Sequence, residues 1–411
     1  MKFNELTLNK KLLSAINDMG YDNPTPIQEK AIPIALQGED VLGLAQTGTG
    51  KTASFMLPIL EKLSKGPLKK IRALVIAPTR ELAEQIHQSS ISLSKYMPIQ
   101  SVSIYGGVSK YGQIKTLKKG IEIIIACPGR LLDLIGDGVI NLSSVEVLVL
   151  DEADTMCDMG FLPDVRRIMK YLPKDIQILF FAATMPDEIK ELTEDILHNP
   201  HTVQIGKIEP AKTVAHYLYP IKSVSLKTNL LLEFFKITAT GKVIVFTRTK
   251  HRAKRLWSDL ESAKLNVTVL QGNMSQNRRQ QSINGFQRGK YDILVATDMA
   301  SRGIDISEVS HVINFDMPST TDDYIHRIGR TGRAENTGEA VTFLLPQDKK
   351  LLVKIESLLG YKIPEQYIDS FDYNQSIITN KKPTFNKELA KVNNNYRKPN
   401  RKFQYKKKSV S

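Results

Sequence analysis

Short, nearly continuous apolar runs recur along the chain, and they constrain its fold more than any other feature. Longer segments with a helical pattern separate them. Such runs are typical of strands buried on both faces of a parallel sheet, with the intervening helices as right-handed crossovers. Five runs, a break and five more runs predict the α/β fold class with two parallel-sheet lobes. The runs are residues 41–46, 71–77, 121–126, 145–150 and 177–182, and then 243–247, 267–270, 292–296, 309–315 and 339–345.

The chain length supports the same division into lobes. A domain takes roughly 100–200 residues, so 411 residues are enough for two domains and a tail. Between the two sets of runs, residues 206–213 (GKIEPAKT) combine glycine, proline and charge without an apolar period, as linkers do. We therefore expect lobe 1 in residues 1–205 and lobe 2 in residues 214–360, which end in a helix at 346–360. A C-terminal extension occupies residues 361–411.

The positive charge of the protein is concentrated at its C-terminal end. The net charge is +14, and residues 381–411 hold 11 lysines and arginines against one acidic residue. Only +4 remains for residues 1–380. The tail has too little apolar content to pack, so it is expected to be disordered, and its clustered cations with four aromatic rings favour a nucleic-acid anchor. These rings are Phe385, Tyr396, Phe403 and Tyr405.

The composition argues against secretion and membrane insertion. The first residues lack the apolar core of a signal peptide, and no stretch approaches the ~18 apolar residues of a membrane span. Cys127 and Cys157 are too few for a disulfide framework or a four-cysteine zinc site, which favours a reducing compartment. A cytoplasmic protein with two packing cysteines is the expectation.

A glycine-rich segment follows the first apolar run. Residues 45–52 (AQTGTGKT) lie between that strand and a helical pattern, where backbone N–H groups can wrap a triphosphate. In this interpretation Lys51 reaches the β- and γ-phosphates and Thr52 ligates Mg²⁺. Ala45 stands where the strict pattern has glycine, so this is a variant P-loop, and a chance turn is the alternative. The expected phosphate-binding loop consists of Thr47, Gly48, Thr49 and Gly50.

An acidic cluster, Asp151-Glu152-Ala153-Asp154, follows the fourth apolar run. Asp151 is placed to hold Mg²⁺ through its water shell, and Glu152 to polarise an attacking water. Acidic clusters are more often solvated turns or helix caps, but the buried strand directly before this one favours the P-loop partner. Together the two segments predict a nucleotide hydrolase lobe.

The second lobe has an arginine-rich segment and no second P-loop. Residues 326–333 (HRIGRTGR) carry three arginines at fixed intervals, which suits a γ-phosphate, where an arginine finger adds roughly 10³–10⁵ in rate. The alternative is an exposed basic loop that contacts nucleic acid. Because lobe 1 carries the P-loop and lobe 2 the arginines, the sequence predicts an ATP site built by both lobes.

These segments together resemble the DEAD-box family of ATP-dependent RNA helicases, whose lobes are RecA-like. The resemblance covers about residues 3–345. Within the family, the chain is most similar to bacterial RhlE-type members. Further family motifs appear in order: GYDNPTPIQ (Gly20–Gln28), PTREL (Pro78–Leu82), Gly106-Gly107, PGR (Pro128–Arg130), VIVFTRTK (Val243–Lys250), QGNMSQNRR (Gln271–Arg279) and ATDMASRGID (Ala296–Asp305).

The resemblance implies a specific set of ATP contacts. The Gln28 amide can pair with the adenine N6/N7 edge and the Tyr21 ring can stack on the base, which predicts selectivity for ATP. Asp305 matches the residue that contacts ribose. Arg330 and Arg333 match the arginine fingers.

The resemblance also implies RNA contacts and a link between the lobes. The RNA contacts are backbone N–H, hydroxyl and guanidinium groups that suit phosphates and 2′-hydroxyls, so RNA binding is expected to be independent of sequence. They map to Arg80, Gly107, Gly129 and Arg130 in lobe 1 and to Thr249, Arg279 and Thr297 in lobe 2. The lobe-coupling positions are Ala182, Ala183, Thr184 and His326.

Two positions depart from the family pattern. Ala182 replaces the serine of a Ser-Ala-Thr motif, which removes a hydroxyl that would bond toward the acidic cluster. One hydrogen bond is worth about 0.5–1.5 kcal/mol, so weakened coupling between hydrolysis and strand separation is expected, and not its loss. Cys127 replaces the usual threonine before PGR, which removes one side-chain contact to RNA phosphate.

The sequence therefore predicts a cytoplasmic, monomeric RNA helicase that uses ATP and Mg²⁺ and acts on ribosomal precursors or in RNA turnover. It closes on ATP, separates a short duplex locally and resets on hydrolysis. An ATP-gated RNA clamp or annealing scaffold is the first alternative, which Ala182 and the basic tail favour. A DNA translocase of the wider superfamily is the second, and residues 20–28 and 151–154 argue against it.

Overall fold

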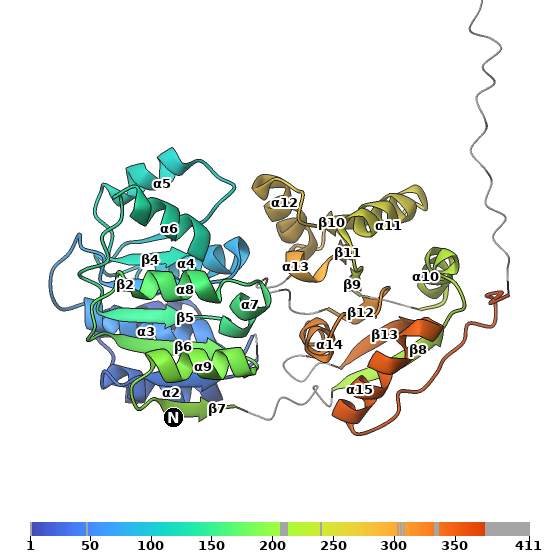
Figure 1. Ribbon diagram of the computed structural model, residues 1–411, viewed down its shortest axis with the longest axis horizontal. Coiled ribbons are helices and arrows are strands. Elements are labelled where there is room, and N and C mark those ends of the chain that lie inside the picture. Colours follow the sequence, from blue (N-terminus) through green and yellow to red (C-terminus); the bar gives the residue numbers. More distant parts are fainter. Residues whose placement is uncertain are drawn as a thin grey trace, which may run out of the picture. The chain divides into compact units, whose positions relative to one another are not determined.

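The computed structural model describes residues 2–46, 48–205, 213–238, 241–301, 304, 306, 309–332 and 337–374. Within these residues the chain forms two separate sheets, one of seven strands and one of six, and every strand pair in both sheets is parallel (Figure 1). The expected α/β fold class with two parallel-sheet lobes is confirmed.

The sheet of lobe 1 has the strand order β3-β4-β2-β5-β6-β1-β7. Its central strands are buried along their whole length, because helices cover both faces. The strands are β1 (Val41–Leu44), β2 (Ala73–Ile76), β3 (Ser101–Ile104), β4 (Ile123–Ala126), β5 (Val147–Leu150), β6 (Gln177–Ala182) and β7 (His201–Gln204).

Among the described residues of lobe 1, nine helices form the two outer layers. One apolar core lies between the sheet and α1–α4, and a second lies between the opposite face and α5–α9. Alternate residues of one strand enter different cores, as Val149 and Leu150 do in β5. The helices are α1 (Lys10–Asp18), α2 (Pro26–Leu36), α3 (Lys51–Leu63), α4 (Arg80–Leu93), α5 (Lys110–Leu117), α6 (Pro128–Gly136), α7 (Ala153–Asp158), α8 (Leu162–Met169) and α9 (Asp187–Ile196).

Lobe 2 repeats this architecture with the strand order β10-β11-β9-β12-β13-β8. Its strands are β8 (Val214–Pro220), β9 (Val243–Phe246), β10 (Val267–Leu270), β11 (Ile293–Ala296), β12 (His311–Asn314) and β13 (Gly338–Leu344). Its helices are α10 (Lys227–Ile237), α11 (Lys250–Ser262), α12 (Gln276–Gln287), α13 (Asp298–Ser301), α14 (Thr321–Ile328) and α15 (Lys349–Leu359). Short 3₁₀ turns lie at Phe3–Glu5, Val224–Leu226 and Pro346–Asp348.

All ten apolar runs are strands, and the helix expected at 346–360 is α15 with its preceding 3₁₀ turn. Three further strands, β3, β7 and β8, were not expected from the sequence. Each lies at the edge of its sheet, and each is only partly buried. Edge strands alternate between buried and exposed residues, so they lack the continuous apolar run that marks a central strand.

Part of the C-terminal extension packs on lobe 2. The Leu218 N–H donates to the Pro364 carbonyl (2.9 Å), and the Gln366 N–H donates to the Leu218 carbonyl (2.7 Å). The side chains of Ile363, Ile368 and Phe371 are buried. These contacts extend the edge of the sheet at β8.

Two expectations fall largely outside the described residues: the linker, of which only Thr213 is described, and the basic tail at 381–411. Thr213 bonds within lobe 2, since its hydroxyl donates to the Gly332 carbonyl (2.7 Å). Along the described part of the chain, every helix is too short or too polar to cross a bilayer.

Candidate nucleotide and RNA sites

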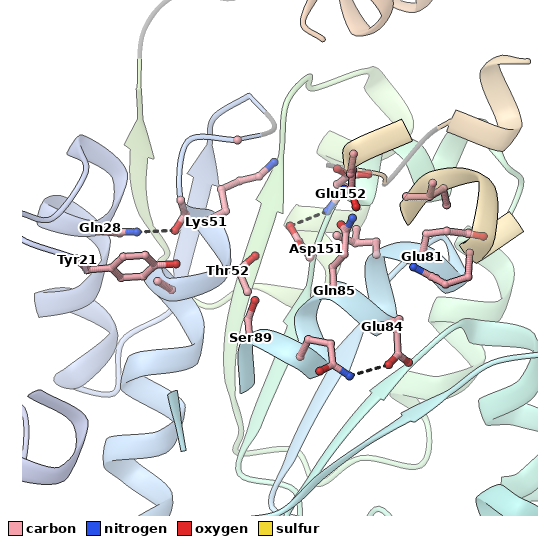
Figure 2. A pocket seen from close by; sticks show the side chains of 18 residues that line it. Tyr21, Gln28, Lys51, Thr52, Glu81, Glu84, Gln85, Ser89, Asp151 and Glu152 are labelled. Carbon is pink, nitrogen blue, oxygen red and sulfur yellow. Dashed lines mark hydrogen bonds between the residues drawn. The ribbon is translucent and has the colours of Figure 1, made fainter. Parts of the chain in front are cut away.

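A cavity of about 540 Å³ lies at the carboxyl ends of the strands of lobe 1. Segments that follow β1 and β5 line one wall of it, because parallel strands bring their carboxyl ends to one edge of the sheet. Further lining comes from α4 and α12. Among the residues labelled in Figure 2, those that the sequence assigned to nucleotide binding or catalysis are Tyr21, Gln28, Lys51, Thr52, Asp151 and Glu152.

The P-loop has the backbone that a phosphate cradle requires. Gly48 and Gly50 have φ angles of 82° and 93°, in the left-handed region that glycine adopts without strain. Lys51 is the first residue of α3, and its buried ammonium donates to the Ala45 carbonyl (3.0 Å). The Thr49 hydroxyl donates to the Gln46 carbonyl (2.7 Å). Thr47 lies outside the described residues.

The expected adenine element packs directly on this loop. The Gln28 amide donates to the Gly50 carbonyl (3.0 Å) and accepts from the Thr25 N–H (2.9 Å). A Cβ on Gly50 would collide with that amide, so glycine is required here by space as well as by φ. The Tyr21 ring lies parallel to Phe3, with 6.4 Å between centroids, and remains 40% exposed. Gln28 and Tyr21 therefore hold one end of the cavity, where the adenine contact remains a prediction.

The acidic pair after β5 is buried. The Asp151 carboxylate accepts from the Glu152 N–H (3.1 Å), and both side chains are less than 10% exposed. Glu152 has left-handed backbone angles (φ 53°, ψ 51°), which cost a residue with a Cβ about 1–2 kcal/mol. Burial raises the pKa of the Glu152 carboxyl to about 7, against the lowering effect of the Lys51 ammonium. Burial also raises the pKa of Asp151, which Lys51 again opposes.

The expected Mg²⁺ ligands fit a hard cation. Asp151 and Thr52 offer a carboxylate and a hydroxyl in the same cavity, and these oxygens are the donors that Mg²⁺ prefers. The described part of the chain holds no cluster of three His, Cys, Asp or Glu side chains that could cage a metal. Mg²⁺ in nucleotide sites is typically held by few protein groups, with substrate phosphates and water as its other ligands. The ion would supply charge neutralisation at the phosphates.

Asp154 connects the acidic cluster to the next strand. One of its oxygens accepts from the backbone N–H groups of Ala183 (3.0 Å) and Thr184 (2.8 Å) and from the Thr184 hydroxyl (3.2 Å). Ala182, the last residue of β6, is fully buried in the core. Three hydrogen bonds therefore join the two motifs in the absence of a serine hydroxyl at position 182.

The expected RNA contacts of lobe 1 follow the three strands at the other end of its sheet. Arg80 begins α4 after β2, Gly107 follows β3, and Gly129 and Arg130 lie in the first turn of α6 after β4. A Cβ on Gly107, whose φ is 81°, would collide with the Arg80 guanidinium. Arg130 donates to the Gln113 side chain (2.9 Å). These residues share one edge, beside the nucleotide half of the sheet.

Lobe 2 divides in the same way. Thr249 follows β9 and caps α11, where its hydroxyl accepts from the Arg252 N–H (3.2 Å), and Thr297 follows β11. Arg279, on α12 after β10, donates to Glu81 (2.6 Å) and to the Ala300 carbonyl (3.0 Å). The three expected RNA residues thus follow β9, β10 and β11, whereas His326 and Arg330 follow β12.

A model of the DEAD/DEAH box helicases matches residues 25–192, and one of the helicase conserved C-terminal domain matches residues 226–335. The DEAD-box ATP-dependent RNA helicase RhpA of Helicobacter pylori is 44% identical over 377 residues, which are 92% of this chain and 76% of RhpA. The ATP-dependent RNA helicase CshA of Listeria monocytogenes is 41% identical over 355 residues, 86% of this chain and 68% of CshA.

The chain belongs to the DEAD-box family. It is an ATP-hydrolysing enzyme with ATP-dependent RNA helicase activity, as the motifs predicted. Among solved structures, S. cerevisiae Dbp5 bound to RNA and ADP BeF3 is similar, with a TM-score of 0.80 and 32% identity over 88% of this chain and 95% of that one. This similarity confirms the RecA-like fold of both lobes. The RhlE-type assignment stays a prediction.

The arginines of the motif at 326–333 have different surroundings in the structure. The Arg327 guanidinium makes a two-pronged ion pair with Asp298 (2.5 and 2.7 Å) and donates to Asn314 (2.9 Å) and to the Asp316 carbonyl (2.7 Å). Arg327 thereby fixes α14 to the sheet. Arg330 is also buried and donates to the Ile304 carbonyl. Arg333 and Asp305 lie outside the described residues.

Sequence reasoning missed two ion pairs that hold functional segments in place. They are Arg327–Asp298 and Arg279–Glu81, and in both pairs the partners are far apart in the sequence. A pattern can mark each charged residue, but only the fold brings the partners together. The Cys127 thiol, by contrast, fits its expected packing role, since burial raises its pKa to about 12 and keeps it protonated.

We predict that Glu152→Gln stabilises this helicase at alkaline pH while it abolishes hydrolysis. A carboxyl whose pKa is raised from 4.5 to about 7 destabilises the fold increasingly as pH rises between these values, and fully above them. The neutral amide lacks this penalty, so the free energy of unfolding at pH 8 should rise by roughly 1–3 kcal/mol and change little at pH 4.5. Thermal or urea unfolding at both pH values measures this.

Glu84→Gln is the matched control for that experiment. Burial acts to raise the pKa of Glu84, but hydrogen bonds from Gln88 and Ser103 bring it below its usual value. Stability that depends on this carboxylate is present above its unfolded pKa, so the substitution should destabilise the protein at pH 8. Equal shifts for Glu152→Gln and Glu84→Gln would contradict the assigned environments.

We also predict that Arg327 and Arg330 differ in what they support. Arg327→Ala leaves Asp298 and Asn314 without their guanidinium partner and should lower the free energy of unfolding by about 3–5 kcal/mol. Arg330→Ala should retain a cooperative unfolding transition and lose roughly 10³-fold or more in kcat. Steady-state ATPase and thermal unfolding of both variants test this, and a stable Arg327→Ala would contradict it.

Proposed function

We propose that the helicase binds RNA without sequence preference across both lobes, closes when ATP binds, and locally separates short duplexes. Hydrolysis then releases the strand. The observation that carries this proposal is that both sheets are divided in the same way. In each sheet the expected nucleotide-binding groups follow one set of neighbouring strands, and the expected RNA-binding groups follow the other set.

The nucleotide half supplies the groups that ATP hydrolysis needs. Lys51, Asp151 and Thr52 line one cavity, which supports the proposal that Lys51 meets the β- and γ-phosphates while the other two offer oxygens for Mg²⁺. Glu152 acts as the base for the attacking water, a role that a carboxyl with a pKa near neutrality suits. The Arg330 guanidinium lies near enough to Glu152 to lower its pKa, which supports a finger role for Arg330 at the same site.

The RNA half presents donors that suit a backbone and not bases. Gly107 and Gly129 have no side chain of their own beside the peptide N–H, and Arg80 adds a half-buried guanidinium beside Gly107. Phosphate oxygens and 2′-hydroxyls accept from such donors whatever the base, so binding independent of sequence follows. Arg279 would bind RNA through the N–H groups that Glu81 and the backbone carbonyls leave available.

Asp154 is the group that we propose couples the two activities. Its carboxylate holds Ala183 and Thr184 beside the hydrolytic carboxyls, so a shift of the acidic cluster is transmitted to the end of β6. The hydroxyl that Ala182 lacks would add one contact to three existing ones. Coupling is therefore expected to be weaker than with serine, by about tenfold at most.

The second candidate function is an ATP-gated clamp or annealing scaffold, which the absence of that hydroxyl favours. In a clamp, ATP locks the closed state on RNA without duplex release. Ribosomal precursors and RNA-turnover complexes are the partners that we propose for either function, with a cytoplasmic monomer as the acting species. The selectivity for ATP rests on Gln28 and Tyr21.

Parallel assays of ATPase and strand release separate the two functions. The helicase should show RNA-stimulated ATPase and release a labelled strand from short RNA duplexes, with release falling as duplex length grows. Lys51→Ala should abolish both activities, and Ala182→Ser should raise release relative to ATPase. Robust RNA-stimulated ATPase without strand release at any duplex length would favour the clamp.

A further inference from the structure

Lobe 1 has a second groove, at the edge of its sheet opposite the P-loop. Helix α3 starts at Lys51 beside the P-loop and ends in this groove at Leu63, and Ile99 lies just before β3 begins. The groove encloses about 370 Å³. Its apolar lining consists of Leu63, Leu68, Met97, Pro98 and Ile99, and Lys10 and Lys11 form one side.

Partly buried hydrogen bonds hold the walls of this groove in place. The Glu122 carboxylate accepts from the Lys69 N–H in one wall and, with its other oxygen, from the Gln100 N–H in the opposite wall (2.8 Å). On the third side the Asn9 N–H and side-chain amide both donate to Glu61 of α3 (2.7 and 2.9 Å). A groove that is already formed costs a ligand little reorganisation, which favours binding.

The chemistry of the groove is an aliphatic floor beside a basic rim. Leu68 is 44% exposed, which is high for a leucine in a sequence segment (KGPLKK, residues 65–70) that otherwise carries exposed lysines. Lys10 and Lys11 are exposed as well, and none of the residues that line the groove is acidic. The site therefore offers an apolar contact and several positive charges without a compensating carboxylate in its lining.

We propose that this groove docks an acidic segment of a protein partner, with a large aliphatic side chain of that segment against Leu68 and Met97. Charge complementarity selects this occupant, because carboxylates would pair with the lysine rim while the anchor buries apolar surface. RNA fits the floor poorly, since the lining has no aromatic ring on which a base could stack. The tail of this chain carries +10 over residues 381–411 and would be repelled.

The position of the groove allows the partner to stay bound during catalysis. The nucleotide and RNA contacts described above lie at the carboxyl ends of the strands, and the groove lies at their amino ends. A bound segment would thus recruit the helicase without occupying its active edge. This inference does not rest on the duplex-separating function, because the groove, its charges and its fixed walls are independent of it.

Selection from a random dodecapeptide display library on the full chain tests the proposal. Enriched peptides should be net acidic and carry a large aliphatic residue near their centre. A synthetic peptide with that consensus should bind the unmodified chain at least tenfold more tightly than Lys10→Glu/Lys11→Glu or Leu68→Asp. RNA-stimulated ATPase should be unchanged in both variants, which shows that they are folded.

Lys118→Glu/Lys119→Glu is the matched control, because it reverses two adjacent exposed lysines elsewhere on lobe 1. This variant should bind the consensus peptide like the unmodified chain. An enriched consensus that is neutral or basic, or no consensus that depends on Lys10 and Lys11, would overturn the proposal. So would an oligouridylate probe whose affinity falls with Lys10→Glu/Lys11→Glu but not with the control, since the occupant would then be RNA.

Discussion

The parallel order of the strands is the constraint on which the functional architecture depends. In lobe 1 the neighbours β5, β6 and β1 end beside one another, so the acidic cluster, residues 182–184 and the P-loop meet although they are far apart in the sequence. The adjacent strands β3, β4 and β2 bring the expected RNA contacts to the same edge. Lobe 2 repeats the division with β10, β11 and β9 on one side and β12 on the other. An open α/β sheet binds ligands at the carboxyl ends of its strands, and we propose that here this one edge serves both the nucleotide and RNA.

Buried carboxyl groups give this edge its chemistry, and they also lower the stability of the protein. Asp151 and Glu152 are removed from water, and Glu152 also has a left-handed backbone, so the catalytic turn is less stable than a neutral one would be. The same burial raises the pKa of Glu152 toward neutrality, where a carboxyl can accept a proton during reaction. Other parts of the fold offset this loss of stability. They include the fully buried central strands and the hydrogen-bonded Arg327 guanidinium.

Much of this arrangement could be predicted from the sequence, because its signals are local. Each central strand is a continuous apolar run. The nucleotide-binding half of the lobe 1 sheet is marked by glycines beside a lysine after one strand and by acidic residues after another. The edge strand β3 escaped prediction because only alternate residues of it are fully buried, so it lacks a continuous apolar run. The role of Arg327 also escaped, since the three arginines of residues 326–333 look alike until the fold pairs one of them with Asp298. The ion pair of Arg279 escaped because its partner, Glu81, is distant in the sequence. The groove beside Leu68 has no sequence signal, because three distant segments form it.

The central claim is that nucleotide and RNA binding are coupled through neighbouring parts of one edge. The most direct measurement is the dissociation constant of a short oligouridylate, with and without ADP and beryllium fluoride, the nucleotide state present in the Dbp5 structure. Coupling predicts that this nucleotide tightens RNA binding at least tenfold, or about 1.4 kcal/mol, and that RNA tightens nucleotide binding by the same factor. Asp154→Asn should reduce both effects together. RNA affinity that is the same in the two nucleotide states would contradict the account.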